Sequence, residues 1–234
     1  MSEANPRQNV RFPSSGREVA GYLALPEAGR GPGVIVVQEW WGLDDHLASI
    51  VDRLAAEGFV ALAPDLYGGR VAHGAADAQQ MLAELPVDQA ARDLGGSVDF
   101  LLGHEAVTST QLGAVGFCMG GGFVLLLAVQ QGDKIAAVVP FYGIGPAVPD
   151  TYTALTADLQ GHYAIHDEAY PVEQARSQEE QLRAESQGSV EYFYYQAGHA
   201  FNNDENKAGN YDPKAAATAW GRTVDFLQSH LATA

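Results

Sequence analysis

The sequence predicts an α/β protein with a mostly parallel central sheet flanked by helices. Short apolar runs alternate with longer segments whose apolar residues recur at helical spacing, as in strand–helix–strand units. The run from Val34 to Val37 is apolar throughout, which is typical of a strand buried on both faces. Because 234 residues suit one large core, we expect a single domain over residues 1–234.

The first half of the chain predicts an antiparallel hairpin followed by alternating strands and helices. Val10–Phe12 and Val19–Leu25 flank a Pro-Ser-Ser-Gly segment, and two β-rich runs around such a turn favour a hairpin. Further strands are expected at 34–37 and 59–63. Helices are expected from about Asp45 to Gly58 and around the apolar stripe of Ala91, Leu94, Val98 and Leu101.

The second half continues this alternation and ends in a long helix. Asp212 followed by Pro213 is a typical helix start, because aspartate caps the first turn and proline fits its first position. The expected strands cover 112–115, 135–141, 163–165 and 190–195. The expected helices cover 123–129, Pro171 to about Ser186, and Pro213 to about Leu231.

Composition and charge exclude several classes of partner. The formal net charge of −16 should repel nucleic acid and anionic membrane surfaces. No apolar run approaches the roughly 20 residues of a membrane span, and the polar start of the chain does not read as a secretory signal. A single cysteine permits no intrachain disulfide. We therefore expect a cytoplasmic protein with a small-molecule substrate.

The lone cysteine lies in the sequence Gly-Phe-Cys-Met-Gly over residues 116–120. An apolar strand candidate precedes this segment and an apolar helix candidate follows it. Such a sharp glycine turn raises a nucleophile to the top of a parallel sheet and points the next backbone N–H at a substrate carbonyl. Cys118 therefore predicts an acyl-transfer enzyme with a thiolate nucleophile.

Five polar side chains lie just after predicted strands. Ligands bind such sheets at the carboxyl ends of the strands, so Glu39, Asp65, Cys118, Asp167 and His199 could lie along one edge. Cys118, Asp167 and His199 also occur in the order nucleophile, acid, base that this architecture uses. A histidine can take and return the thiol proton while an acid holds the ring in the correct tautomer.

With these motifs, the chain resembles the dienelactone hydrolase family, which has the α/β-hydrolase fold, over nearly its whole length. The resemblance implies cleavage of an ester or lactone through an acyl-enzyme without a cofactor. It implies Cys118 as nucleophile, His199 as base and Asp167 as the orienting acid. The matching stretches are residues 38–42, 63–67, 116–121, 141–143, Asp167 with Pro171, and 198–201.

The resemblance also implies roles for Glu39 and for two backbone amides. Glu39 matches a family glutamate that contacts the resting thiol and helps to deprotonate it. The N–H groups of Trp40 and Met119 would form the oxyanion hole. Independently, Glu39 follows four apolar residues and precedes two tryptophans, and apolar surroundings raise the pKa of a carboxyl towards neutrality.

One departure from the family concerns the substrate. Family members that hydrolyse dienelactone hold its carboxylate with arginines, one of them just after the catalytic histidine. Here residues 200–204 read Ala-Phe-Asn-Asn-Asp, without an arginine. Arg70 and Lys207 are the remaining candidate cations for substrate binding. We therefore expect a neutral or differently anchored ester or lactone.

Other interpretations compete with the triad. Cys118 could be a small buried apolar residue, Glu168 could replace Asp167 as the acid, and Asp167 could be a helix cap. Glu39 could merely cap or pair at a strand end. Asp65 is expected to be structural, because the turn that follows Pro64 needs local hydrogen bonds. At the level of function, a thioesterase or aryl esterase could use the same scaffold. A non-catalytic thiol sensor or ligand-binding protein is a further alternative, although a sensor often has a second, resolving cysteine.

A metal site is not expected. His162, His166 and Asp167 are the candidate ligands, but residues four apart on a strand are separated by about 13 Å. That separation is too large for two ligands of one ion. These patterns leave the oligomeric state, the pathway and the exact substrate open.

Overall fold

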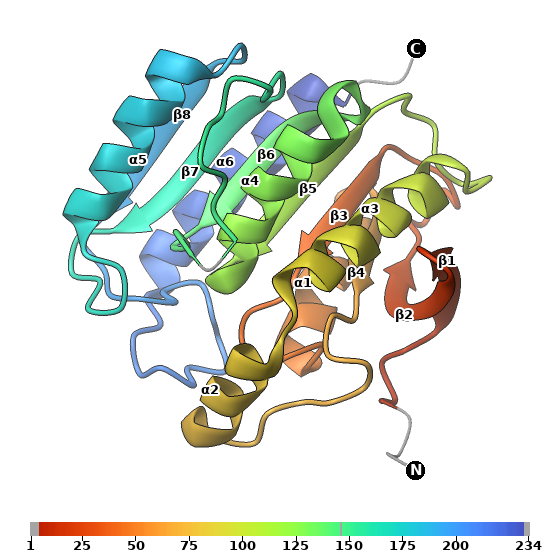
Figure 1. The fold of residues 1–234 in the computed structure, drawn as a ribbon, viewed down its shortest axis with the longest axis horizontal. Coiled ribbons are helices and arrows are strands. Elements are labelled where there is room, and N and C mark those ends of the chain that lie inside the picture. The colour runs from red at the N-terminus through yellow and green to blue at the C-terminus, as the bar shows by residue number, and fades with distance from the viewer. Residues whose placement is uncertain (1–4, 146, 232–234) are drawn as a thin grey trace.

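In the computed structural model, residues 5–145 and 147–231 are described, and their strands form one eight-stranded sheet (Figure 1). The strands are β1 (Val10–Ser14), β2 (Arg17–Ala24), β3 (Gly33–Val37), β4 (Val60–Pro64), β5 (Leu112–Phe117), β6 (Ile135–Phe141), β7 (Asp158–Ala164) and β8 (Val190–Tyr195). Their order in the sheet is β1-β2-β4-β3-β5-β6-β7-β8. β2 pairs antiparallel with β1 and β4, and the other neighbours are parallel. The predicted hairpin and mostly parallel sheet are confirmed.

Helices cover both faces of this sheet. They are α1 (Asp45–Ala56), α2 (Ala75–Glu84), α3 (Val87–Leu102), α4 (Met119–Gln131), α5 (Val172–Glu185) and α6 (Pro213–His230), with a 3-10 turn at Gly132–Lys134. α1 and α6 pack on one face, and α3, α4 and α5 pack on the other (Figure 1).

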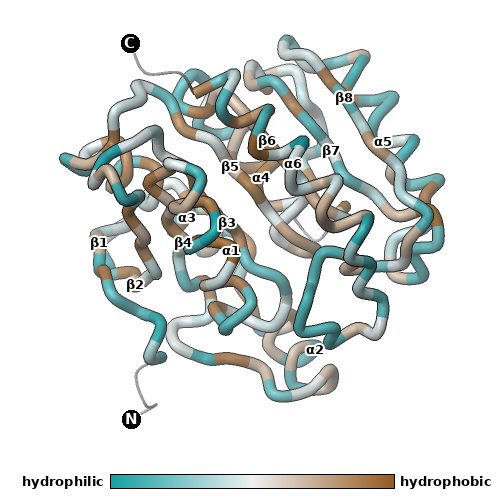
Figure 2. The backbone as a smooth tube through the Cα atoms, turned by 180° about the vertical axis from the view of Figure 1, so that it is seen from behind, coloured by the Kyte–Doolittle hydropathy of each residue, from teal (hydrophilic) through white to brown (hydrophobic). Residues whose placement is uncertain are grey.

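The central strands are apolar on both sides because both of their faces are covered. Val34 and Val36 belong to the core beneath α1 and α6, whereas Ile35 and Val37 belong to the core on the opposite face, as the two-residue period of a strand requires. Figure 2 shows apolar stretches along the central strands and α4. No helix in the described ranges is long and apolar enough to cross a membrane.

Two helix starts follow the capping signals in the sequence. The Asp44 carboxylate accepts the Leu47 N–H at 2.9 Å at the start of α1. The Asp212 carboxylate accepts two N–H groups at the start of α6, and Pro213 takes the first helical position. Asp44 and α1 follow β3 closely, so this cap helps to place the segment that contains Glu39.

The helix α2 was not predicted from the sequence. It buries only Ala78 and Met81, so its apolar stripe is short. These two side chains pack against Trp41 and Ala72. α2 therefore covers the loop region around one of the two tryptophans that follow Glu39.

The start of β7 also differs from the prediction. The strand begins at Asp158 and ends at Ala164, whereas the apolar pattern suggested only 163–165. The sequence misleads here because Gln160 and His162 are polar yet buried. They belong to a hydrogen-bonded cluster with neighbouring elements rather than to the apolar core.

Candidate active site

Cys118 occupies the strained turn between β5 and α4. Its backbone has φ 52° and ψ −118°, a conformation that costs free energy in a residue with a side chain. The glycines around it are required by close packing. A Cβ at Gly116 would lie 2.1 Å from the Gly120 carbonyl oxygen, and one at Gly120 would lie 2.4 Å from that of Val37. The turn therefore presents the thiol at the carboxyl end of β5.

Cys118, His199 and Asp167 lie in one hydrogen-bonded chain. The Cys118 Sγ is 3.3 Å from His199 Nε2, and His199 Nδ1 is 2.8 Å from Asp167 Oδ2. The other carboxylate oxygen, Asp167 Oδ1, accepts the N–H groups of Ala169 at 2.8 Å and Tyr170 at 2.7 Å. Asp167 therefore closes its own loop and orients the imidazole at the same time. Its rival Glu168 is exposed.

The charge of His199 is decided by its two partners. Burial opposes the imidazolium, but the hydrogen bonds and charges of Asp167 and Cys118 outweigh burial and raise the pKa of His199 to about 10. The rings of Tyr142 and Tyr170 lie 5.4 and 5.5 Å from the imidazole. The arrangement favours an imidazolium that can hold the thiol proton.

Glu39 is buried beside this chain, with both carboxylate oxygens occupied. Oε1 accepts the Tyr142 hydroxyl at 3.1 Å, and Oε2 accepts the Asn203 amide at 2.7 Å. Burial raises the pKa of Glu39 above its ordinary value. Within the described residues, the Cys118 thiol forms its hydrogen bond with His199, and no hydrogen bond joins it to Glu39.

Tyr142 and Asn203 were missed by the sequence analysis. Tyr142 follows β6 with a left-handed φ of 37° and is fully buried. Asn203 is also buried, four residues after His199. The available signal was weak: a pair of amides at 202–203 stands where the family arginine was expected.

Two backbone donors next to these side chains are free. Within the described ranges, the N–H groups of Trp40 and Met119 have no hydrogen-bond acceptor. Met119 is the first residue of α4, where helix geometry leaves N–H groups without an internal partner. Free donors of this kind can stabilise an oxyanion if both reach the same point.

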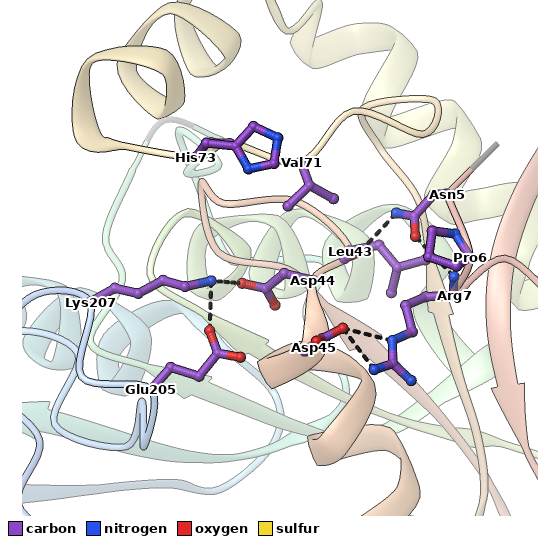
Figure 3. Close-up of a pocket in the computed structure, with 11 residues that line it drawn as sticks. Asn5, Pro6, Arg7, Leu43, Asp44, Asp45, Val71, His73, Glu205 and Lys207 are labelled. Carbon is purple, nitrogen blue, oxygen red and sulfur yellow. Dashed lines mark hydrogen bonds and ion pairs between the residues drawn. The ribbon is translucent and has the colours of Figure 1, made fainter. Parts of the chain in front are cut away.

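The two candidate cations are each held by carboxylates. Arg70 is exposed and pairs with Glu84 at 2.8 Å. Lys207 pairs with Asp44 and with Glu205 (Figure 3). Lys207 lines a cavity of about 400 Å³ that Cys118, Asp167 and His199 do not line. Neither cation is presented free to the thiol.

The remaining candidates from the sequence analysis form hydrogen bonds outside the Cys118–His199–Asp167 chain. Asp65 is buried and accepts the N–H groups of Tyr67 and Gly69 at 3.0 and 2.8 Å, a turn-forming role. His162 bonds to neighbours inside the sheet, whereas His166 bonds to Gln196 at 3.0 Å. In the part of the chain that the structure describes, no group of three or more His, Cys, Asp or Glu could hold a metal ion.

Comparisons with known proteins place the chain in a family. The model of the dienelactone hydrolase family matches residues 19–231. Protein usf from Aquifex pyrophilus is 34% identical over 230 residues, covering 96% of this chain and 99% of that protein. An Aquifex aeolicus protein, provisionally named carboxymethylenebutenolidase, is 31% identical over 230 residues with the same coverage.

Solved structures share the whole fold. A protein from Klebsiella pneumoniae, provisionally described as a dienelactone hydrolase, superposes with a TM-score of 0.83 at 28% identity, covering 93% of this chain and 96% of that one. A dienelactone hydrolase-like promiscuous phosphotriesterase from metagenomic libraries gives 0.82 at 26% identity, covering 95% and 97%. The chain belongs to the dienelactone hydrolase family and is a carboxylic ester hydrolase with the α/β-hydrolase fold.

Proposed function

We propose that Cys118, His199 and Asp167 act as nucleophile, base and orienting acid in the hydrolysis of an ester or lactone. The observation that carries this proposal is the unbroken chain from Sγ through the imidazole to a carboxylate that is itself fixed by two N–H groups. A buried cysteine of purely structural importance needs neither the strained turn nor a paired imidazole. No cofactor or metal is required by this chemistry.

The first half of the reaction forms a thioester. The thiol proton passes to His199 Nε2, and the thiolate attacks the carbonyl carbon of the substrate. The tetrahedral oxyanion is stabilised by the N–H groups of Trp40 and Met119. Collapse of this intermediate breaks the bond to the leaving oxygen, which takes the proton from the imidazolium. With an ester, this stage leaves the acyl group on Cys118 and releases an alcohol; with a lactone, the ring opens and the new hydroxyl or enol stays attached to the acyl group on Cys118.

The second half regenerates the enzyme. His199 removes a proton from water, and the resulting hydroxide attacks the thioester carbonyl through the same oxyanion site. Collapse breaks the carbon–sulfur bond, the thiolate recovers the proton from His199, and the carboxylic acid leaves. Asp167 holds the ring so that Nε2 faces the reacting atoms in both steps.

Glu39 is proposed as a negative charge beside the triad that favours the His199 imidazolium and so helps the thiol to lose its proton. Its carboxylate receives two hydrogen bonds, from Tyr142 and Asn203, and donors of this kind favour its ionised form. The positive charge of His199 in turn lowers the pKa of Glu39. The two groups therefore support each other in their charged states.

The proposed substrate is a neutral ester or lactone. To bind a carboxylate, Arg70 would have to leave Glu84, and Lys207 would have to leave both Asp44 and Glu205. The net charge of −16 also opposes an anionic substrate. Among the solved relatives, the phosphotriesterase bears a name that indicates an uncharged substrate class. We further propose a single-domain cytoplasmic enzyme, since the lone thiol must stay reduced to react.

The test compares the wild type with Cys118→Ala on a substrate panel. The panel holds p-nitrophenyl acetate, a neutral lactone, a dienelactone, an acyl thioester and an aryl phosphotriester. We expect a burst of nitrophenol from the wild type, loss of ester hydrolysis in the variant, and a kcat/KM for dienelactone no greater than for the neutral esters. Because Cys118 is the only cysteine, its alkylation by iodoacetamide should abolish activity with one label per chain.

Two outcomes would contradict the proposal separately. Equal rates for the wild type and Cys118→Ala would overturn the thiol mechanism. A kcat/KM for dienelactone far above that for the neutral esters would overturn the substrate preference and leave the triad in place.

A further inference from the structure

A second aspartate–histidine pair lies beside Glu39. His46, in the first turn of α1, is only 3% exposed. Its Nδ1 is 2.8 Å from the Oδ1 of Asp204, whose side chain is 49% exposed. The other ring nitrogen, Nε2, is buried and has no hydrogen-bond partner within the described ranges. A buried ring nitrogen without a partner is costly, so it calls for an explanation.

One short loop connects this pair to Glu39. Asn203 donates its amide to Glu39 Oε2 at 2.7 Å, and the next residue, Asp204, holds His46. Two consecutive residues therefore fix the carboxylate and the imidazole in relation to each other. His46 and Asp44 are also the charged groups of the α1 start that act on Glu39.

The same region contains other buried polar atoms without partners in the described structure. They are both polar side-chain atoms of Asn202 and the Oδ1 of Asn203. Together with His46 Nε2 they give four such atoms on three residues that surround the loop. Clusters of unsatisfied polar atoms are where proteins hold buried water. A water molecule in this region could accept the His46 Nε2–H and pass a hydrogen bond on to Glu39.

The other positively charged groups near Glu39 are shared with other carboxylates or act on it less than His46. Lys207 pairs with Asp44 and Glu205. His199 also lowers the pKa of Glu39, but less than His46 does, and its ring is hydrogen-bonded to Asp167 and the thiol. Arg53, whose charge interacts with Asp204, lies over the Trp220 ring.

The hydroxyl of Tyr142 and the amide of Asn203 are neutral donors. Burial raises the pKa of Glu39, and the charge of His46 is the largest influence that lowers it again. A buried carboxylate with neutral partners needs a counter-charge to remain ionised.

We propose that His46, oriented by Asp204, is a positioning residue that keeps Glu39 ionised through its Nε2–H and one buried water. The inference rests on the proposed function, in which the charge of Glu39 favours the His199 imidazolium and so helps the thiol to lose its proton. Only an ionised Glu39 can do this. His46 therefore sets the lowest pH at which the site works, without touching the substrate.

The test follows the ionisation of Glu39 directly. The infrared carbonyl band of its protonated carboxyl is identified as the band absent from Glu39→Gln, and its pH midpoint is compared among variants. In His46→Gln we expect the midpoint to rise by about one pH unit, a tenfold change in acid dissociation. Asp204→Asn should raise it by less. The acid limb of kcat/KM should move with the midpoint.

The matched control is His230→Gln. His230 also pairs with an aspartate, Asp158, at 3.2 Å, but it lies at the end of α6. It should leave the Glu39 midpoint unchanged. Asp204→Asn keeps the test available should His46→Gln fail to fold, because Asp204 is half exposed. An unchanged midpoint in the folded variants would overturn the proposal.

Failure of the proposed function would give a different result. If Glu39→Gln retained full activity, Glu39 would have no catalytic role, yet the infrared midpoint would still report whether His46 controls its charge. A shifted midpoint with an unshifted acid limb would refute the link to catalysis, and an unshifted midpoint would refute the link between His46 and Glu39.

Discussion

A partly buried and a fully buried histidine in the same half of the sheet have opposite charge preferences. His199 follows β8 and has a pKa raised to about 10, whereas His162 in β7 has a pKa lowered by burial to about 3. Their exposed fractions, 16% and 0%, are both small. Burial disfavours the imidazolium in each case. The difference therefore comes from what each ring contacts.

The partners of His162 suit a neutral ring. The Thr223 hydroxyl donates to the Ala219 carbonyl, so its oxygen is left to accept His162 Nε2–H at 3.1 Å. The Tyr195 oxygen accepts a hydrogen bond from Arg222, so its hydroxyl can donate to His162 Nδ1 at 2.9 Å. The Arg222 charge further lowers the pKa of His162. Such a ring holds the core together and takes no second proton.

The partners of His199 suit a ring that gains and loses a proton. Asp167 accepts from Nδ1 on one side, and the Cys118 thiol faces Nε2 on the other. The chain supplies His162 and Asp167 only five residues apart, one within β7 and one in the loop after it. The pKa of a histidine here is thus raised by its partners at the edge of the sheet, a carboxylate among them, rather than set by its depth in the protein.

Replacing Asp167 should have the largest effect on the difference between His199 and His162. We expect Asp167→Asn to lower kcat for p-nitrophenyl acetate by roughly 10³–10⁴-fold, because an amide no longer enforces the reactive tautomer. The pKa of His199, followed by NMR, should fall from about 10 towards its ordinary range.

The neighbouring residue provides the matched control for this prediction. Glu168→Gln alters an exposed carboxylate next to Asp167 and should leave both kcat and the His199 titration unchanged. A large loss in Glu168→Gln with activity retained in Asp167→Asn would show that the acid has been assigned to the wrong residue.

The proposed reactive residues could be brought together from the sequence because the position of each is tied to the fold. Cys118 needs the glycine turn after β5, and Asp167 and His199 follow later strands in the order that a parallel sheet brings to one edge. Tyr142 and Asn203 were not predictable, because their contacts with Glu39 depend on loop conformations without a sequence motif. The φ of 37° at Tyr142 is an example, since a tyrosine gives no hint of it.

The buried polar residues of the core were also not predicted from the sequence. Apolar periodicity identifies strands whose faces are apolar. It therefore predicted β3 and β6 but only the last residues of β7. Gln160 and His162 are buried through hydrogen bonds to β8 and α6, and those partners lie 31 to 61 residues away in sequence. Pairing over such distances leaves no local signal.

The second prediction concerns stability in acid and sharpens the role of His162. Its pKa is about 3 in the folded chain and about 6.5 when unfolded, so only the unfolded chain gains a proton between these values. The stabilising contribution of the neutral ring is complete above pH 6.5 and declines by about 1.4 kcal/mol per pH unit as the pH falls towards 3. His162→Gln should remove this part of the pH dependence.

Urea unfolding between pH 7 and pH 4 measures this effect. The variant should be less stable than the wild type at pH 7, and the gap should narrow in acid. His166→Gln, which alters an exposed histidine four residues further on, should keep the wild-type slope. An unchanged slope in His162→Gln would mean that His162 already carries a proton in the folded protein.

The smallest predicted effect tests whether the His162 cluster is independent of catalysis. Thr223→Val removes the hydroxyl that accepts His162 Nε2–H, but Gln160 Oε1 remains 3.2 Å from the same nitrogen. Because the ring keeps one acceptor, we expect a loss of about 1 kcal/mol in the free energy of unfolding and an unchanged kcat. Thr223→Ser, which retains the hydroxyl, should recover the hydrogen-bond part of that loss. A fall in kcat in the folded valine variant would show that the two histidines are coupled through the sheet, and their opposite charge states would then have to be explained together.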